Sequence, residues 1–321
     1  MTREHTPLTV LLAAPRGFCA GVERAVDVVE LALERYGPPI YVRHAIVHNT
    51  RVVDDLERKG AVFVEDEFDV PRGGRLVFSA HGIPPEVRAN AEDLGLSTID
   101  ATCPLVTKVH YEARDYAADG YEILLIGHAG HQEVVGTTGH APEAIHLVET
   151  VEDVWAVQVA DPDRVAYITQ TTLSVEEAAE VTAAILQRFP NVRGPRGDDI
   201  CYATTNRQEA TKVLADRSDA VIVIGSDTSS NSKRMVEVAL AHGAPAAYLL
   251  DSVEGFEDVW LDGVATLGLT SGASAPEALV DELLAYLEAR PGGAQVKTLD
   301  VVDEQVHFAL PKELRALPTV G

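Results

Sequence analysis

Residues 123–133 read Ile-Leu-Leu-Ile-Gly-His-Ala-Gly-His-Gln-Glu, a short β-forming run that ends in a cluster of polar residues. Residues 40–49 and residues 221–231 have the same form. Each stretch is followed by a second strand-like run, by a third run with a polar end, and by an amphipathic segment. The second runs are residues 61–65, 145–149 and 247–251, and the third runs are residues 76–82, 166–172 and 267–274. The order is the same each time, so the chain contains a unit that occurs three times.

Short strands that alternate with helical segments predict an α/β fold, because parallel strands need a helical crossover between them. We expect three similar βαβ-type domains with parallel sheets around a pseudo-threefold axis. The predicted domains are residues 19–102, 103–200 and 201–290, with residues 1–18 added to the third as a leading strand, and residues 291–321 as a C-terminal tail that packs across the domains. Ligands of open parallel sheets bind beyond the carboxyl ends of the strands. The polar clusters lie at those ends, so we expect them to converge on one central site.

The composition indicates a globular chain, with 46% hydrophobic and 24% charged residues. Its formal net charge of −24 repels nucleic acid, so no nucleic-acid partner is expected. No apolar run is long enough to cross a bilayer, and Met1–Pro7 holds no hydrophobic signal core. We therefore expect a cytoplasmic protein that does not bind a membrane.

Three cysteines, Cys19, Cys103 and Cys201, occupy the same place in the three units. Each ends a short extended run and begins a segment with helical periodicity, where the positive end of a helix dipole favours a thiolate. A buried cysteine is often only a small hydrophobic residue, and structural zinc sites use closely spaced cysteine pairs. Three thiolates from distant segments instead favour an iron-sulfur cluster. A cubane cluster has four irons, so one iron would lack a protein thiolate and would act as a Lewis acid on a substrate.

Histidines also lie at the strand ends, and three of them occupy similar positions: His48, His81 and His131. A single such histidine is more often structural, but three favour binding or proton transfer. Glu133 is the carboxylate of these clusters that lies where a proton donor would be needed. The alternative for Glu133 is a helix-terminal carboxylate that only complements the dipole.

Hydroxyl side chains in residues 229–232 and 171–174 resemble helix N-caps. Helix N-termini with neighbouring hydroxyl groups are also sites for phosphate groups, so these residues together with His48 and His81 predict a diphosphate site. No Gly-x-Gly-x-x-Gly motif opens a helix after a strand, so neither nicotinamide nor flavin is indicated.

Nine motifs in register now support a family resemblance. They are Pro-Arg-Gly-Phe-Cys19-Ala-Gly-Val, Val-His48-Asn, Ser-Ala-His81-Gly, Asp-Ala-Thr-Cys103-Pro-Leu-Val, Gly-His-Ala-Gly-His131-Gln-Glu133-Val, Thr-Gln-Thr171-Thr172-Leu-Ser, Cys201-Tyr-Ala-Thr-Thr-Asn-Arg-Gln, Gly-Ser-Asp-Thr-Ser229-Ser230-Asn231-Ser and Gly-Ala-Ser274-Ala-Pro. In this order the chain resembles the 4-hydroxy-3-methylbut-2-enyl diphosphate reductases, from about residue 8 to residue 315. Ser271 and Met235, where the family often has Ala and Leu, are small departures that we expect to touch no residue with a role.

The resemblance implies a reductive dehydration that ends the methylerythritol phosphate route to isoprenoids. Two electrons and two protons remove the allylic hydroxyl as water and give isopentenyl and dimethylallyl diphosphate. By likeness to the family, the three cysteines hold one 4Fe-4S cluster, and reduced ferredoxin or flavodoxin supplies the electrons. The implied catalytic residues are Glu133, His131 and Thr171. The implied substrate-binding residues are His48, His81, His131, Thr171, Thr172, Ser229, Ser230, Asn231 and Ser274.

Two functions from other classes stay open at this point. A redox-neutral iron-sulfur hydro-lyase would use the open iron only as a Lewis acid, and its turnover would consume no reducing equivalents. A cluster-bearing sensor or electron carrier would have no substrate. Such a carrier is expected to surround its cluster with apolar side chains, whereas these strand ends are rich in His, Ser, Thr and Asn.

Overall fold

The computed structural model describes residues 7–315 of the 321-residue chain. The chain divides into two compact units. The first unit comprises Met1–Cys19, His48–Val52 and Tyr202–Val306, and the second comprises Ala20–Val47, Val53–Cys201 and His307–Gly321.

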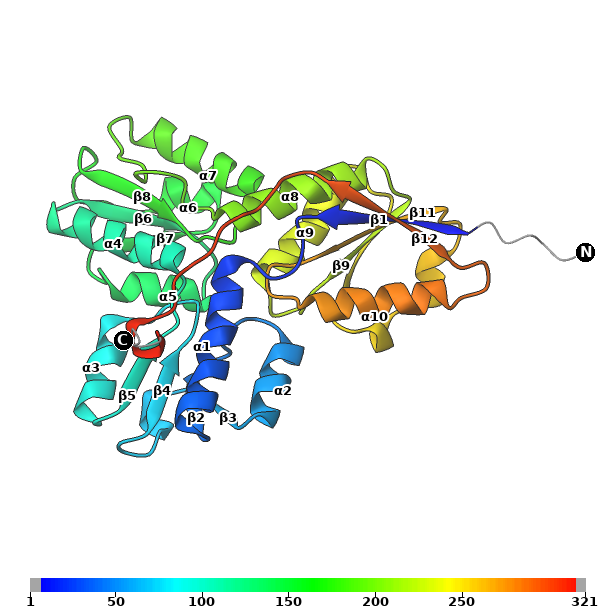
Figure 1. The fold of residues 1–321 in the computed structure, drawn as a ribbon. Helices are drawn as coiled ribbons and strands as arrows, with labels where there is room; N and C mark the ends of the chain where they lie inside the picture. Colours follow the sequence, from blue (N-terminus) through cyan, green and yellow to red (C-terminus); the bar gives the residue numbers. More distant parts are fainter. Residues whose placement is uncertain (1–6, 316–321) are drawn as a thin grey trace, which may run out of the picture. The chain divides into compact units, whose positions relative to one another are not determined.

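Five parallel strands form the sheet of the first unit, in the order β10-β9-β11-β1-β12 (Figure 1). The strands are β1 (Leu8–Ala14), β9 (Ala220–Ile224), β10 (Ala247–Leu250), β11 (Thr266–Ser271) and β12 (Ala294–Asp300). The unit also contains α8 (Tyr202–Ala215), α9 (Ser230–Ala241), α10 (Glu277–Glu288), and the 3-10 helices η2 (Val253–Gly255) and η3 (Asp258–Leu261).

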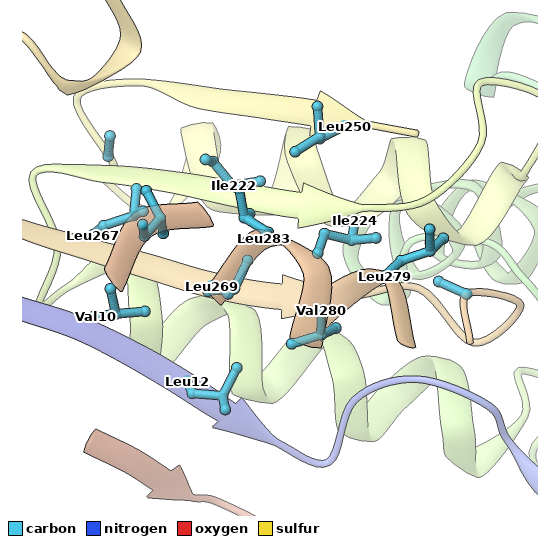
Figure 2. Close-up of a cluster of buried hydrophobic side chains, with 13 residues drawn as sticks. Val10, Leu12, Ile222, Ile224, Leu250, Leu267, Leu269, Leu279, Val280 and Leu283 are labelled. Atoms are coloured by element: carbon cyan, nitrogen blue, oxygen red, sulfur yellow. The ribbon is translucent and has the colours of Figure 1, made fainter. Parts of the chain in front are cut away.

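The core of the first unit lies on both faces of this sheet. Ile222 and Ile224 of β9 belong to a buried cluster that includes Leu279 of α10 (Figure 2). Val223, which points to the opposite face, packs with Met235 of α9 in a separate cluster. Because successive side chains of a strand alternate between the faces, a continuous apolar run is what a parallel strand covered on both sides requires.

The second unit contains two smaller parallel sheets, with strand orders β3-β2-β4-β5 and β7-β6-β8. The strands of the first are β2 (Ile40–Arg43), β3 (Ala61–Val64), β4 (Arg75–Phe78) and β5 (Ser97–Asp100), and those of the second are β6 (Glu122–Ile126), β7 (Ile145–Val148) and β8 (Val165–Thr169). Its helices include α1 (Ala20–Tyr36), α3 (Pro85–Asp93), α4 (Pro104–Ala118), α5 (Gln132–Gly139), α6 (Val151–Ala156), α7 (Val175–Arg188), η1 (Glu67–Asp69) and η4 (Lys312–Leu314). Helix α2 (Thr50–Arg58) begins in the His48–Val52 segment of the first unit.

The three sheets share one three-stranded pattern. In each, the first strand of the repeat lies in the middle, with the second strand on one side and the third on the other: β3-β2-β4, β7-β6-β8 and β10-β9-β11. The predicted α/β fold with three parallel sheets is therefore confirmed. The predicted domain boundaries and the pseudo-threefold axis stay predictions.

Two local expectations were wrong. Residues 291–321 were expected to be a tail without a strand, but Ala294–Asp300 forms β12, which pairs with the whole length of β1; that the tail packs across the domains stays a prediction, and residues 316–321 lie outside the described residues. An extended run was expected before each cysteine, and β1 and β5 supply it before Cys19 and Cys103. No strand precedes Cys201 at the corresponding place, where a single bridge joins Arg193 to β8. Within residues 7–315, the helices are too short or too polar for any of them to cross a bilayer.

Candidate functional site

The three cysteines have the same backbone environment. Each is the residue directly before a helix, namely α1, α4 or α8. Each donates its backbone N–H to the carbonyl oxygen two residues beyond the end of the third strand of a sheet: Cys19 to Ala273 (3.2 Å), Cys103 to Ala80 (3.0 Å) and Cys201 to Thr171 (3.1 Å). The sequence prediction that every cysteine lies at a helix N-terminus is therefore correct.

The chemistry of these donors fits an iron-sulfur cluster. All three thiols are half-buried and outside any disulfide bond, and each lies where the helix dipole favours the thiolate that a cluster needs. Within residues 7–315, no three His, Cys, Asp or Glu side chains are arranged to hold a single metal ion. Cys19 belongs to the first unit, and Cys103 and Cys201 belong to the second. That the three share one cluster stays a prediction.

A buried carboxylate lies beside the Cys201 segment in the second unit. Glu133, in the first turn of α5, is only 2% exposed. Its Oε1 accepts a hydrogen bond from the backbone N–H of Thr171 at 2.6 Å, and its Oε2 accepts from the Thr171 hydroxyl at 3.0 Å. The carbonyl of the same threonine accepts the N–H of Cys201. Thr171 therefore connects the carboxyl group of Glu133 directly to a cysteine-bearing segment.

Burial raises the pKa of Glu133 from 4.5 to about 7, although both hydrogen bonds from Thr171 act in the opposite direction. The nearby Asp199 raises this pKa further. A carboxyl group with a pKa near neutrality exchanges protons readily at physiological pH, which is the property of a general acid.

One predicted histidine contacts Glu133, and a second contacts that histidine. His131 is the N-cap of α5, and its Nδ1 accepts the backbone N–H of Glu133 at 3.2 Å. The rings of His131 and His81 contact edge to face, with centroids 6.0 Å apart. Ser79 Oγ lies 3.4 Å from Nδ1 of His81. The hydroxyl of Thr172 accepts a hydrogen bond from the Gln170 side chain at 2.7 Å.

Hydroxyl and amide groups gather at the N-terminus of α9 in the first unit. Ser229 is the N-cap of this helix, and its Oγ accepts the N–H of Ser232 at 3.3 Å. The hydroxyl of Ser274 lies 3.4 Å from the same Oγ and donates to the backbone carbonyl of His48 at 2.9 Å. Ser230 is the first residue of α9. The predicted helix cap at Ser229 is confirmed, and His48 and Ser274 lie beside it.

A buried polar atom beside this cap, Oδ1 of Asn231, has no protein partner, and its residue is only 4% exposed. A buried polar atom left unpaired costs free energy. An amide oxygen only accepts hydrogen bonds, so Oδ1 of Asn231 would pair with a donor group of a ligand, whereas a phosphate oxygen would have to be bound by the Nδ2 group.

One expectation about sequence departures was wrong. Met235 was expected to touch no residue with a role, but its sulfur lies 3.6 Å from Nδ2 of Asn231. The two residues are four positions apart on α9, so they occupy the same face of the helix. The sulfur of Met235 therefore helps to orient the Asn231 amide.

The structure thus brings the predicted residues together in two groups. His81, His131, Glu133, Thr171 and Thr172 lie in the second unit, whereas His48, Ser229, Ser230, Asn231 and Ser274 lie in the first. Their convergence on one central cavity stays a prediction.

Sequence reasoning missed Asp199, although it stands two residues before Cys201. This carboxylate is buried, accepts the N–H of Thr169 at 2.9 Å, and receives a hydrogen bond from Lys108 at 2.8 Å. Burial raises its pKa to about 7. The acidic pair Asp198–Asp199, which is separated from Cys201 by Ile200, was the available signal.

Comparisons with known proteins give a consistent result. A family model described as LytB protein matches residues 10–288. A relative from Leifsonia xyli subsp. xyli, named 4-hydroxy-3-methylbut-2-enyl diphosphate reductase, is 58% identical over 306 residues, which are 95% of this chain and 90% of the relative. A relative of the same name from Azoarcus sp. is 56% identical over 306 residues, covering 95% of this chain and 97% of its own.

Two solved structures are also similar. The E-1-hydroxy-2-methyl-but-2-enyl-4-diphosphate reductase from Plasmodium falciparum has a TM-score of 0.93 and 41% identity, over 96% of this chain and 97% of that one. A structure of (E)-4-hydroxy-3-methyl-but-2-enyl diphosphate reductase, described as the terminal enzyme of the non-mevalonate pathway, has a TM-score of 0.63 and 31% identity, over 87% and 98% of the two chains. The resemblance predicted from nine sequence motifs is confirmed by these matches.

Proposed function

The chain belongs to the LytB protein family, and we propose that it reduces (E)-4-hydroxy-3-methylbut-2-enyl diphosphate. The reaction takes two electrons and two protons, breaks the bond between the allylic carbon and its hydroxyl oxygen, and releases water. Its products are isopentenyl diphosphate and dimethylallyl diphosphate, the last products of the methylerythritol phosphate route. Reduced ferredoxin or flavodoxin would deliver the electrons in the cytoplasm.

The cluster that this reaction needs would be held by Cys19, Cys103 and Cys201. When bound, a 4Fe-4S cluster with three thiolate ligands would supply electrons and an open iron as a Lewis acid. The equivalent backbone positions of the three cysteines support this assignment.

The single observation that carries the proposal is the chain of contacts from Glu133 through Thr171 to Cys201. A hydroxyl group leaves as water only when it receives a proton. The carboxyl group of Glu133 holds a proton near neutral pH because it is buried. Thr171, hydrogen-bonded to it, would orient the substrate hydroxyl or relay the proton, and His131 would complete the surroundings of that hydroxyl.

The diphosphate would be bound by His48, His81, Thr172, Ser229, Ser230, Asn231 and Ser274. Hydroxyl groups at the start of α9 support this role for the first-unit residues. Since the chain has a net charge of −24, such an anion site depends on local dipoles and hydrogen bonds.

The decisive experiment is anaerobic purification followed by a Mössbauer spectrum and an assay with the allylic diphosphate and a reduced low-potential donor. We expect a 4Fe-4S spectrum, two electrons consumed per substrate, and both isopentenyl and dimethylallyl diphosphate as products. Turnover without consumption of reducing equivalents would instead identify a redox-neutral hydro-lyase. A cluster that accepts electrons without converting the diphosphate would identify an electron carrier or sensor.

A further inference from the structure

Three cations hold the chain segments that lead into the three cysteines, and the first is Arg24. This residue lies in the second turn of α1, the helix that follows Cys19. Its Nη1 donates to the carbonyl oxygens of Ala101 at 3.0 Å and Thr102 at 3.1 Å, directly before Cys103. Burial lowers the pKa of Arg24 from its usual value, and the charges of Asp100 and Cys103 oppose that effect. The guanidinium group therefore lies within electrostatic range of the Cys103 sulfur.

The second cation is Lys108, in the second turn of α4, the helix that follows Cys103. Its Nζ donates to the carbonyl oxygens of Gly197 at 3.1 Å and Asp198 at 3.0 Å, and to Oδ1 of Asp199 at 2.8 Å. All three acceptors lie in the segment that leads to Cys201. An ammonium group has three donors, so Lys108 uses its full hydrogen-bonding capacity on this one segment.

The third cation is Arg207, in the second turn of α8, the helix that follows Cys201. It is fully buried. Its Nη2 donates to the carbonyl oxygens of Gly17 at 2.8 Å and Phe18 at 3.4 Å, and its Nη1 pairs with Glu304 at 3.0 Å. These carbonyl groups directly precede Cys19. A buried guanidinium is costly unless it is paired; Glu304 supplies the charge partner, and the Nε and Nη2 donors bind the segment before Cys19.

The three contacts form a closed cycle along the chain. The helix after Cys19 holds the segment before Cys103, the helix after Cys103 holds the segment before Cys201, and the helix after Cys201 holds the segment before Cys19. A general need for surface ion pairs would not place a cation at the same turn of all three helices. The repetition instead indicates a function that the three cysteines share.

We propose that Arg24, Lys108 and Arg207 are positioning residues for the iron-sulfur cluster, each fixing the peptide groups before one ligand cysteine and adding a positive charge beside it. This inference rests on the proposed ligation by the three cysteines. The reduction potential of such a cluster depends on nearby charge and hydrogen bonding, and cations favour the more negative reduced state. In a chain of net charge −24, these cations would keep the potential within reach of a biological donor.

The test compares Arg24→Gln and Lys108→Gln with Arg114→Gln in the cluster-loaded protein. Arg114 is exposed on the same helix as Lys108 and stacks on Tyr111, so the control removes one charge from α4 without touching a cysteine-bearing segment. The measurements are the reduction potential, from an anaerobic titration followed by electron paramagnetic resonance, and the rate of iron loss to a chelator. We expect both test variants to shift to lower potential and to lose iron about tenfold faster or more. The control should match the wild type.

Conservative variants separate charge from geometry. Arg24→Lys keeps the charge but lacks the planar fork, so its potential should stay near that of the wild type while iron loss is faster. At the buried Arg207, the test variant is Arg207→Lys, because it keeps the positive charge whose loss would endanger folding. Potentials and iron-loss rates equal to the control in both Gln variants, with the cluster intact, would overturn the positioning role alone. A wild-type chain that holds no cluster after anaerobic reconstitution would overturn the ligation proposal and this inference together.

Discussion

The starts of helices α5 and α9 are built alike but carry different chemistry. Each helix follows the middle strand of the repeated three-stranded pattern, and a glycine stands directly after that strand, Gly127 or Gly225. A Cβ at Gly127 would lie 2.7 Å from a Val134 side-chain carbon, and a Cβ at Gly225 would lie 2.2 Å from the Ser232 hydroxyl. In both cases, the contact is made seven residues later. The two segments therefore share one close approach that only glycine permits.

The side chains on this common backbone separate two tasks. On α5 the N-cap is His131, and Glu133 lies two positions later. The corresponding pair on α9 is Ser229 and Asn231. Glu133 is buried and twice hydrogen-bonded to Thr171, whereas Asn231 keeps an unpaired Oδ1. The first arrangement suits proton donation, and the hydroxyl and backbone N–H groups at the start of α9 suit anion binding. One repeated backbone thus carries two different sets of polar side chains.

The largest expected effect concerns the cysteines, which occur at the same place in all three repeats. Cys19→Ser, Cys103→Ser and Cys201→Ser should each abolish the cluster absorbance and the activity, because each removes a ligand that no neighbour can replace. Visible spectra and iron content of anaerobically purified variants provide the measurement. A full 4Fe-4S spectrum from a chain with only two of these cysteines would contradict ligation by all three.

The next largest effect tests whether Glu133 on α5 acts in proton transfer and not in binding. Glu133→Gln keeps the size of the side chain and most of its hydrogen bonds but removes the acid, so the single-turnover rate should fall about a hundred- to ten-thousandfold. The substrate should still bind and perturb the spectrum of the oxidised cluster. Near-normal turnover would remove Glu133 from the mechanism and leave it a structural role.

The pH dependence of stability tests the same carboxyl group without any cluster. Its pKa is raised by burial from 4.5 to about 7, so the folded state keeps the proton where the unfolded chain has released it. This contribution is fully present below pH 4.5 and is lost as the pH rises through 7, by at most about 3 kcal/mol. Between pH 5 and 8, the free energy of unfolding of the wild type should therefore fall relative to that of Glu133→Gln, measured with denaturant. Parallel curves would show that the folded state does not raise this pKa.

A smaller effect is expected on α9. Asn231→Ala should weaken binding of the allylic diphosphate about ten- to a hundredfold, since a hydrogen bond to a charged group is worth about 1.5 to 3 kcal/mol. Asn231 does not cap the helix, so stability should change little. Titration of the substrate into the oxidised enzyme measures the affinity. Unchanged affinity would leave the amide without a role in binding.

Local sequence patterns predicted the strands, the helix starts and the position of each cysteine, because these depend on neighbouring residues. Strand β12 was missed since its alternating, largely exposed residues are not distinctive outside the sheet. The burial of Glu133 was also missed, because it depends on Thr171, which lies 38 residues away. The contacts of Arg24 and Arg207 with carbonyl groups were also not predictable from the sequence, because every residue has a backbone carbonyl and the sequence does not show which one is bound. The contact of Asn231 with Met235 was predictable from helical spacing.

The smallest effect tests whether Ser229 is more than a helix cap. Thr150 caps α6 in a complete capping box, with its hydroxyl accepting the N–H of Asp153 at 3.2 Å, and it has no predicted role in the reaction. Thr150→Ala should lower the free energy of unfolding by about 1 kcal/mol and leave substrate affinity unchanged. Ser229→Ala should lose a similar amount of stability and also bind the diphosphate more weakly. If the two variants match in both stability and affinity, Ser229 is only a cap, and the anion site on α9 depends on Asn231 and its other neighbours.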